Sequence, residues 1–177
     1  MIISDIHGSS YFLSKALDIY KKENCKKLII LGDILYHGPR NDLPFGYAPK
    51  EVISLLNPLK NEIMAVKGNC DAEVDQMVLD FDCSTNDRVM DYDNLKIFIT
   101  HGHHHNIQEL NTSENFDVLL HGHTHIPAII KQDNYYYINP GSISLPKDGT
   151  KNSLIIYKDR KFDFRDLDNK SYQEIKL

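Results

Sequence analysis

Aspartate, asparagine and histidine recur along the chain in patterns that could bind metal ions. Seven of the nine histidines lie between residues 101 and 125. In two pairs, Asp5 with His7 and His123 with His125, one residue separates the partners, so both side chains of a pair can turn toward one point. The oxygen and nitrogen donors suit Mn, Fe, Zn or Ni better than Ca or Mg. The candidate metal ligands, which are enough for two ions, are Asp5, His7, Asp33, Asn69, His101, His123 and His125.

Two neighbouring cations would bring a defined chemistry to such a site. Ions that share a water molecule lower its pKa from 15.7 toward neutrality and turn it into a hydroxide nucleophile. No protein nucleophile is then needed. The chain accordingly has no Gly-x-Ser-x-Gly elbow. Two such ions would therefore be able to activate a water molecule.

Each motif also has an ordinary structural explanation. An Asp-x-His pair in a loop is usually solvated surface, and Gly32-Asp33 or Gly68-Asn69 after a strand can be a simple turn. The run from 101 to 105 can be an exposed loop. Each explanation is plausible for a single motif. Because all the motifs follow predicted strands, it is improbable that such explanations account for all of them.

Short apolar runs precede each group of candidate ligands. Strands are expected at 1–4, 27–31 and 62–66, and the intervening helices begin near Ser9 or Ser10 and at Pro49. This βαβαβ order favours a parallel sheet. Ligands bind beyond the carboxyl ends of such strands, so five loops should meet there.

The second half of the chain has the pattern of hairpins. Strands are expected at 88–92 and 95–100 around an Asp93-Asn94 turn, at 117–120, at 128–131 with 135–138, and at 154–157 with 161–164. Short helices are expected at 73–79 and 107–110. No repeat or linker divides the chain, so residues 1–177 are predicted to form a single domain.

Composition excludes several classes of protein. Hydrophobic residues make up 41% of the 177 residues, which excludes wholesale disorder. The net charge of −5 argues against an extended nucleic-acid surface. The three cysteines form no CxxC pair, which predicts a reducing, cytoplasmic location. No apolar run approaches the ~20 residues that span a bilayer, so neither a membrane segment nor a signal peptide is expected.

Five blocks of the sequence resemble the calcineurin-like metallophosphoesterases, and within them the small bacterial phosphodiesterases of the YfcE type. The blocks are Asp5-Ile6-His7, Gly32-Asp33, Gly68-Asn69, His101-Gly102-His103 and Gly122-His123-Thr124-His125. The resemblance runs from Ile3 to about Pro146. It implies a mixed α/β (α+β) fold of two packed mixed β-sheets flanked by helices, a four-layer α/β/β/α sandwich. Relatives usually have a few more residues before the first block, so the first strand is expected to be shortened or to start upstream.

The resemblance also implies roles for individual residues. One metal ion would be held by Asp5, His7, Asp33 and His125, and the other by Asp33, Asn69, His101 and His123, with Asp33 bridging. The cofactor would be two divalent transition-metal ions, Mn in the first place, with Zn, Ni or Fe as alternatives. The catalytic residues implied are Asp33, Asn69 and His103.

Substrate contacts follow from the same comparison. Many relatives carry histidine beside the metal-binding asparagine, whereas this chain has Cys70, and a thiol is a poorer proton donor. His103 is an alternative donor to the leaving group. Arg40 could hold a substrate oxygen with help from Asn41, although the loop 37–47 could equally be a subunit contact or a simple surface loop.

The function predicted is a metal-dependent phosphodiesterase that hydrolyses small phosphodiesters through a hydroxide bridging two metal ions. A phosphomonoesterase and a non-catalytic interaction scaffold of the retromer-subunit type are the alternatives. The complete ligand set argues against the scaffold, since buried charges without metal are costly. The partner expected is a small phosphoester substrate, and a homo-oligomer is compatible with the sequence.

Overall fold

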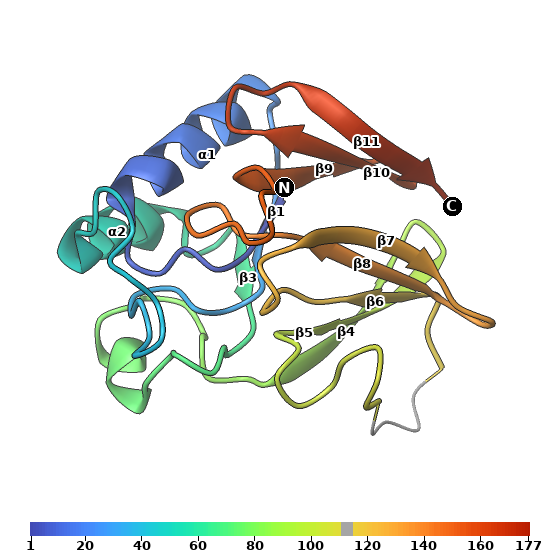
Figure 1. The fold of residues 1–177 in the computed structure, drawn as a ribbon, viewed down its shortest axis with the longest axis horizontal. Coiled ribbons are helices and arrows are strands. Elements are labelled where there is room, and N and C mark those ends of the chain that lie inside the picture. Colours follow the sequence, from blue (N-terminus) through green and yellow to red (C-terminus); the bar gives the residue numbers. More distant parts are fainter. Residues whose placement is uncertain (111–114) are drawn as a thin grey trace.

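The computed structural model describes residues 1–110 and 115–177, and they form two packed β-sheets with two α-helices on one side (Figure 1). The helices are α1 (Ser10–Lys22) and α2 (Pro49–Leu56), and the 3-10 helices are η1 (Asn57–Leu59) and η2 (Glu73–Met77). The strands are β1 (Ile2–Ile3), β2 (Leu28–Ile30), β3 (Ile63–Ala65), β4 (Asp87–Tyr92), β5 (Leu95–Thr100), β6 (Val118–Leu120), β7 (Pro127–Lys131), β8 (Tyr136–Pro140), β9 (Ser153–Lys158), β10 (Lys161–Asp166) and β11 (Ser171–Lys176).

Both sheets are mixed: the six-stranded sheet has a parallel half and an antiparallel half, and the five-stranded sheet has a parallel centre with an antiparallel strand at each edge. The six-stranded sheet has the order β11-β10-β9-β1-β2-β3, and the five-stranded sheet has the order β4-β5-β6-β8-β7. Strands β1, β2 and β3 are parallel, as the βαβαβ pattern predicts. Strands β5, β6 and β8 are parallel as well. The three predicted hairpins β4–β5, β7–β8 and β9–β10 are confirmed.

Alternating side chains of the strands fill two apolar layers. In β1, Ile3 packs with the helices through Leu13 of α1, whereas Ile2 faces the second sheet and packs in the cluster that contains Ile97 and Val118. Successive side chains of a strand point to opposite faces, so a strand between two layers is apolar throughout. The central strands are therefore packed on both faces, and they fix the positions at which the loops after them begin.

Two predicted helices differ in the structure. Residues 107–110 are irregular, because the side chain of Asn106 accepts the N–H groups of Gln108 and Glu109 and so competes with helical hydrogen bonding. This loop packs Ile107 and Leu110 on the outer face of the second sheet, where the described residues place no helix. The 73–79 segment forms only the 3-10 helix η2, whose Asp75 carboxylate accepts the Ala72 N–H.

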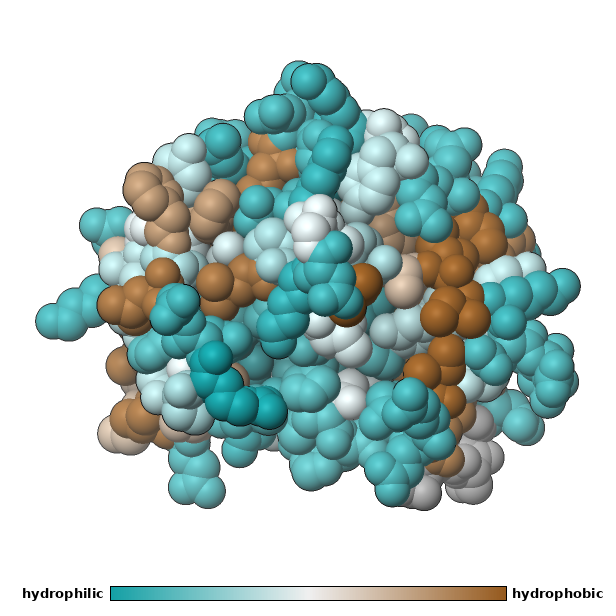
Figure 2. Space-filling view, in the orientation of Figure 1, coloured by the Kyte–Doolittle hydropathy of each residue, from teal (hydrophilic) through white to brown (hydrophobic). Residues whose placement is uncertain are grey.

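The outer surface is mostly hydrophilic (Figure 2). In that view apolar residues gather toward the right, where β7 and β8 lie in Figure 1. Strand β7 is the edge of the five-stranded sheet, and its Ile130 is 41% exposed. No helix in the described part of the chain is long and apolar enough to span a bilayer.

Candidate metal centre

The seven predicted ligands converge where the parallel strands of both sheets end. Three of them form a first cluster, in which the Nε2 atoms of His7 and His125 lie 3.2 Å apart. The Oδ1 atom of Asp5 lies 3.7 Å from the His7 nitrogen and 3.3 Å from the His125 nitrogen. All three residues are buried, so this group could hold one ion shielded from solvent.

A second cluster lies beside the first. The Nε2 atom of His101 is 3.1 Å from Oδ1 of Asn69 and 3.2 Å from Nδ1 of His123. Asp33 stands between the clusters, because its Oδ2 atom is 3.6 Å from Nε2 of His7 and 3.5 Å from Nε2 of His101. Its other oxygen accepts the Cys70 N–H at 2.8 Å. One carboxylate oxygen therefore faces both clusters.

Backbone carbonyls orient three of the imidazoles. The Nδ1–H groups of His7, His101 and His125 donate to the carbonyl oxygens of Tyr36, Leu31 and Leu145 at 2.8, 2.6 and 2.6 Å. A carbonyl only accepts, so the proton of each neutral ring sits on Nδ1 and Nε2 presents a lone pair. This is the arrangement that fixes histidine ligands around metal ions.

The donor set fits divalent cations. Oδ1 of Asp5 is buried without a hydrogen-bond partner, and facing imidazole lone pairs at 3.2 Å repel one another unless a cation or a proton lies between them. Burial would lower the pKa of His101, but hydrogen bonding to Asp33 and the charges of Asp5 and Asp33 raise it to about 9. A metal ion on this ring must therefore displace a proton.

The backbone at the clusters is strained. Five of the seven candidate ligands have a left-handed conformation, with φ of 55° at Asp5, 47° at His7, 54° at Asp33, 64° at His123 and 62° at His125. For residues other than glycine this costs on the order of 1–3 kcal/mol each and is typical of functional sites. The hydroxyls of Ser142 and Ser144 both donate to the Asp5 carbonyl at 2.8 Å and hold one of these turns.

A cleft of about 390 Å³ opens beside both clusters, and Asp33, Asn69, His123 and His125 form its inner wall. The predicted substrate residues Arg40, Asn41 and Cys70 line it, together with Thr124 and Lys147. Thr124 belongs to the fifth block but had no predicted role, and Lys147 lies outside every block. His103 is not among the lining residues. Its ring lies against that of His101, with the centroids 5.3 Å apart.

Comparison with known proteins identifies the family. A model of the calcineurin-like phosphoesterase superfamily domain matches residues 1–161. The chain belongs to this superfamily. Phosphodiesterase YfcE of Escherichia coli K12 is 42% identical over 149 residues, which cover 84% of this chain and 81% of the relative. Phosphodiesterase MJ0936 of Methanocaldococcus jannaschii is 30% identical over 147 residues, 79% of this chain and 81% of that protein.

Solved structures show the same fold. The structure of the E. coli phosphoesterase Yfce superposes with a TM-score of 0.94 at 38% identity and covers 99% of this chain and 97% of its own. Vacuolar protein sorting 29 of Cryptosporidium parvum gives a TM-score of 0.64 at 16% identity over 99% of this chain and 96% of its own, which shows the fold alone. The chain is thus a phosphoesterase, and its family implies divalent metal ions.

Two groups that could protonate a leaving group in this phosphoesterase are weakly suited to that task. Burial and the neighbouring Asp33 carboxylate raise the pKa of the Cys70 thiol to about 12. Burial and the charge of His101 lower the pKa of His103 to about 4, so that this ring is neutral at pH 7. Neither side chain is therefore a ready acid near neutral pH.

Asp71 organises the phosphoesterase site without belonging to either cluster. Its buried carboxylate accepts the N–H groups of Asp33, Ile34 and Gly68 at 2.8, 2.7 and 2.7 Å. It thereby ties the loop after β2 to the loop after β3. Asp71 had no predicted role, because only the fold shows which N–H groups it faces.

Replacing Asp71 by Asn should loosen both loops. One acceptor oxygen cannot serve all three N–H groups, so we expect the free energy of unfolding to fall by about 1–3 kcal/mol. The affinity for Mn²⁺ should fall by about 10–100-fold, as it does when a partner of a metal ligand is removed. Thermal unfolding and calorimetric titration with Mn²⁺ measure the two effects.

Asp75→Asn provides the matched control, because Asp75 is also buried and caps a backbone N–H, that of Ala72. It should lose stability but keep its affinity for Mn²⁺. Equal Mn²⁺ affinity in Asp71→Asn and the wild type would show that Asp71 only stabilises the fold.

Proposed function

We propose that this chain is a metal-dependent phosphodiesterase acting on small phosphodiesters with two divalent ions. The observation that carries the proposal is the position of Asp33 Oδ2 between two clusters of nitrogen and oxygen donors beside an open cleft. Identity to named phosphodiesterases supports it. Asp5, His7 and His125 would hold one ion, Asn69, His101 and His123 the other, and Asp33 both. The mixed donor set favours Mn, with Zn, Ni or Fe as alternatives.

The bound ions supply a water activated for attack on phosphorus and positive charge for the phosphoryl oxygens. Arg40 and Lys147 add positive charge from the exposed walls of the cleft, where a phosphate oxygen or a second ester group would lie. The amide of Asn41 already donates to the His37 carbonyl at 2.7 Å. Asn41 would therefore shape the loop that carries Arg40, while Arg40 contacts the substrate.

The leaving group would depart with little help from the protein. Because the Cys70 thiol is a weak acid and the His103 ring is neutral near pH 7, an alkoxide of high basicity would leave slowly. Diesters with acidic, aryl-type leaving groups should be better substrates than alkyl monoesters. Rates on an aryl diester and on the monoester of the same leaving group would separate the proposed phosphodiesterase from the alternative of a phosphomonoesterase.

Metal removal tests the proposal directly. Protein stripped with a chelator should not hydrolyse an activated aryl phosphodiester, and Mn²⁺ should restore hydrolysis, because the attacking water needs the ions. Elemental analysis after reconstitution should give two ions per chain. One ion or none at saturating Mn²⁺ would contradict the dinuclear site.

The scaffold alternative has a different outcome in the same experiment. A non-catalytic protein would show no metal-dependent hydrolysis of any phosphomonoester or phosphodiester. The complete ligand set supports the enzyme. The likeness to vacuolar protein sorting 29, at 16% identity, is one of fold alone and does not support the scaffold. That residues 1–177 form a single domain stays a prediction. A cytoplasmic, reducing location is a second prediction, and the three free cysteines favour it.

A further inference from the structure

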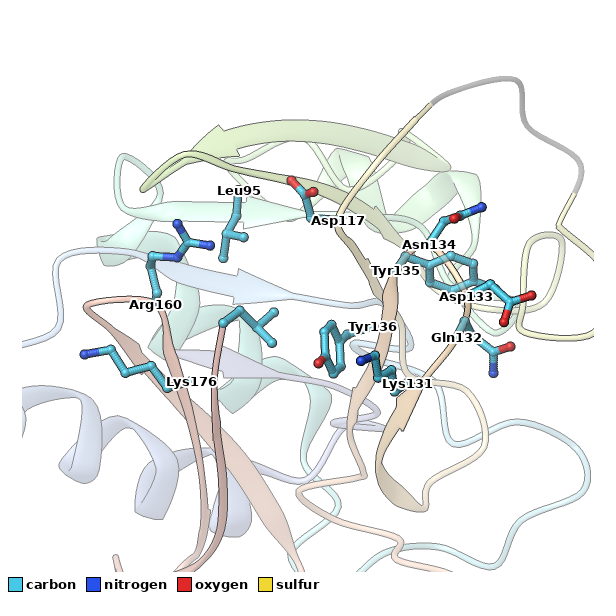
Figure 3. Close-up of a pocket in the computed structure, with 11 residues that line it drawn as sticks. Leu95, Asp117, Lys131, Gln132, Asp133, Asn134, Tyr135, Tyr136, Arg160 and Lys176 are labelled. Carbon is cyan, nitrogen blue, oxygen red and sulfur yellow. The ribbon is translucent and has the colours of Figure 1, made fainter.

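A second groove, of about 440 Å³, lies between the two sheets at the end away from the metal centre (Figure 3). Its walls include Leu95 at the start of β5 and Asp117 just before β6, whereas the candidate ligands follow the ends of these strands. A six-residue strand such as β5 spans about 20 Å. The groove is therefore separate from the cleft of the phosphoesterase site.

Three cationic side chains from three different elements line this groove. They are Lys131 of β7, Arg160 of the β9–β10 turn and Lys176 of β11. Among the described residues none of the three forms an ion pair with a carboxylate. The Nε atom of Arg160 is also buried without a hydrogen-bond partner. Two acidic side chains, Asp117 and Asp133, line the groove as well.

The remaining lining divides into an apolar floor and a polar rim. Figure 3 shows Leu95 and Tyr136 between Arg160 on one side and Lys131 on the other. The Lys131 ammonium is 6.0 Å from the centre of the Tyr136 ring. Of the two acidic groups, Asp117 already accepts the Lys96 N–H at 2.8 Å. The amides of Gln132 and Asn134 complete the rim.

Arg160 lies in a tight turn with a left-handed backbone. Asp159 and Arg160, with φ of 52° and 63°, form a two-residue turn between the paired residues Lys158 and Lys161. Such turns strongly favour glycine at the second position. Arginine is present there although its left-handed conformation is strained.

We propose that this groove binds a small phosphate ester with a flat, largely apolar body, of the nucleoside monophosphate class. The Arg160 guanidinium, with Lys176, would hold the phosphate through charge-assisted hydrogen bonds. The planar body would lie on Tyr136 and Leu95, and the rim amides would contact its edge. The volume lies within the usual range for small-molecule sites.

Site-resolved NMR titration of the zinc-loaded full chain tests this, because it separates groove binding from binding at the metal centre. Adenosine monophosphate should shift the amide signals of residues 131–136 and 158–161 with a saturation curve independent of those at 69–70 and 123–125. Adenosine and inorganic phosphate, each lacking one half of the ligand, should bind the groove at least tenfold more weakly. Adenosine that binds as tightly as adenosine monophosphate would overturn the assigned phosphate contacts, and inorganic phosphate that binds as tightly would overturn the assigned contacts of the planar body.

Arg160→Gly is the decisive variant, since glycine suits the turn and should keep or raise the melting temperature. Its affinity for adenosine monophosphate at the groove should fall at least tenfold, as expected for losing a charge-assisted hydrogen bond. Asn94→Gly makes the equivalent change in the Asp93-Asn94 turn, whose φ values are 53° and 58°, and should leave binding unchanged. Absence of groove shifts at millimolar ligand, or equal affinity in Arg160→Gly and the wild type, would refute the proposal.

Discussion

Replacing Asp33 by Asn is expected to lower kcat/KM for an activated aryl phosphodiester by more than about 100-fold. Removing a residue that only hydrogen-bonds to a metal ligand already lowers metal affinity or activity by about 10–100-fold. Asp33 lies closer to the chemistry, because its Oδ2 atom faces the ring nitrogens of His7 and His101 at 3.6 and 3.5 Å. A neutral amide cannot supply negative charge to both clusters, so binding of at least one ion should weaken as well.

The fold should survive this substitution, since an Asn side chain has the same shape and can still accept the Cys70 N–H. Circular dichroism and thermal unfolding of the metal-free proteins measure this. Asp163→Asn is the matched control: Asp163 is also buried, but it binds Arg165 at 2.8 Å in β10, far along the chain from the ligand loops. That variant should lose stability and keep its turnover. Near-normal turnover in Asp33→Asn would show that Asp33 is not the bridge.

Cys70→His should raise activity on diesters with poor leaving groups by up to the 10²–10⁴-fold that a positioned acid provides. Cys70 lines the cleft and follows the candidate ligand Asn69, so an imidazole there would face the departing oxygen. The wild-type thiol, with its pKa raised to about 12, leaves that oxygen without an effective donor. Rates on aryl esters should change less, because these groups depart unaided.

The measurement is the dependence of rate on leaving-group pKa for the wild type, Cys70→His and Cys70→Ala. We expect a steep dependence in the wild type and Cys70→Ala, and a shallower one in Cys70→His. The same slope in all three proteins would mean that residue 70 takes no part in leaving-group chemistry.

The convergence of the candidate ligands could be predicted because it depends on strand ends. Short apolar runs locate β1, β2, β3, β5 and β6 within a residue or two, and the polar groups that follow them must meet at one edge if the strands are parallel. Family resemblance then divided the ligands between two ions. The side-chain distances are consistent with that division.

Other features depend on tertiary contacts that local sequence does not encode. The left-handed backbone at Asp5 or His125 is held by distant groups such as Ser142 and by packing of the loops, and no propensity of aspartate or histidine predicts it. Strand β11 was missed because its residues 171–174 are exposed and its polar sequence lacks an apolar alternation. Lys147 reaches the cleft only because its loop folds back beside His125.

The separation in sequence between the two halves of the first cluster has a consequence for folding during synthesis. His7 and His125 meet across 118 residues, and Ile2 of β1 pairs with Ile155 of β9. Contacts of such long range form late and slow the folding of a chain. A ribosome must therefore release most of the chain before the cluster can exist. Metal binding at this cluster would therefore report that these distant parts of the chain have come together, and an incomplete chain that ends before His125 cannot assemble the cluster.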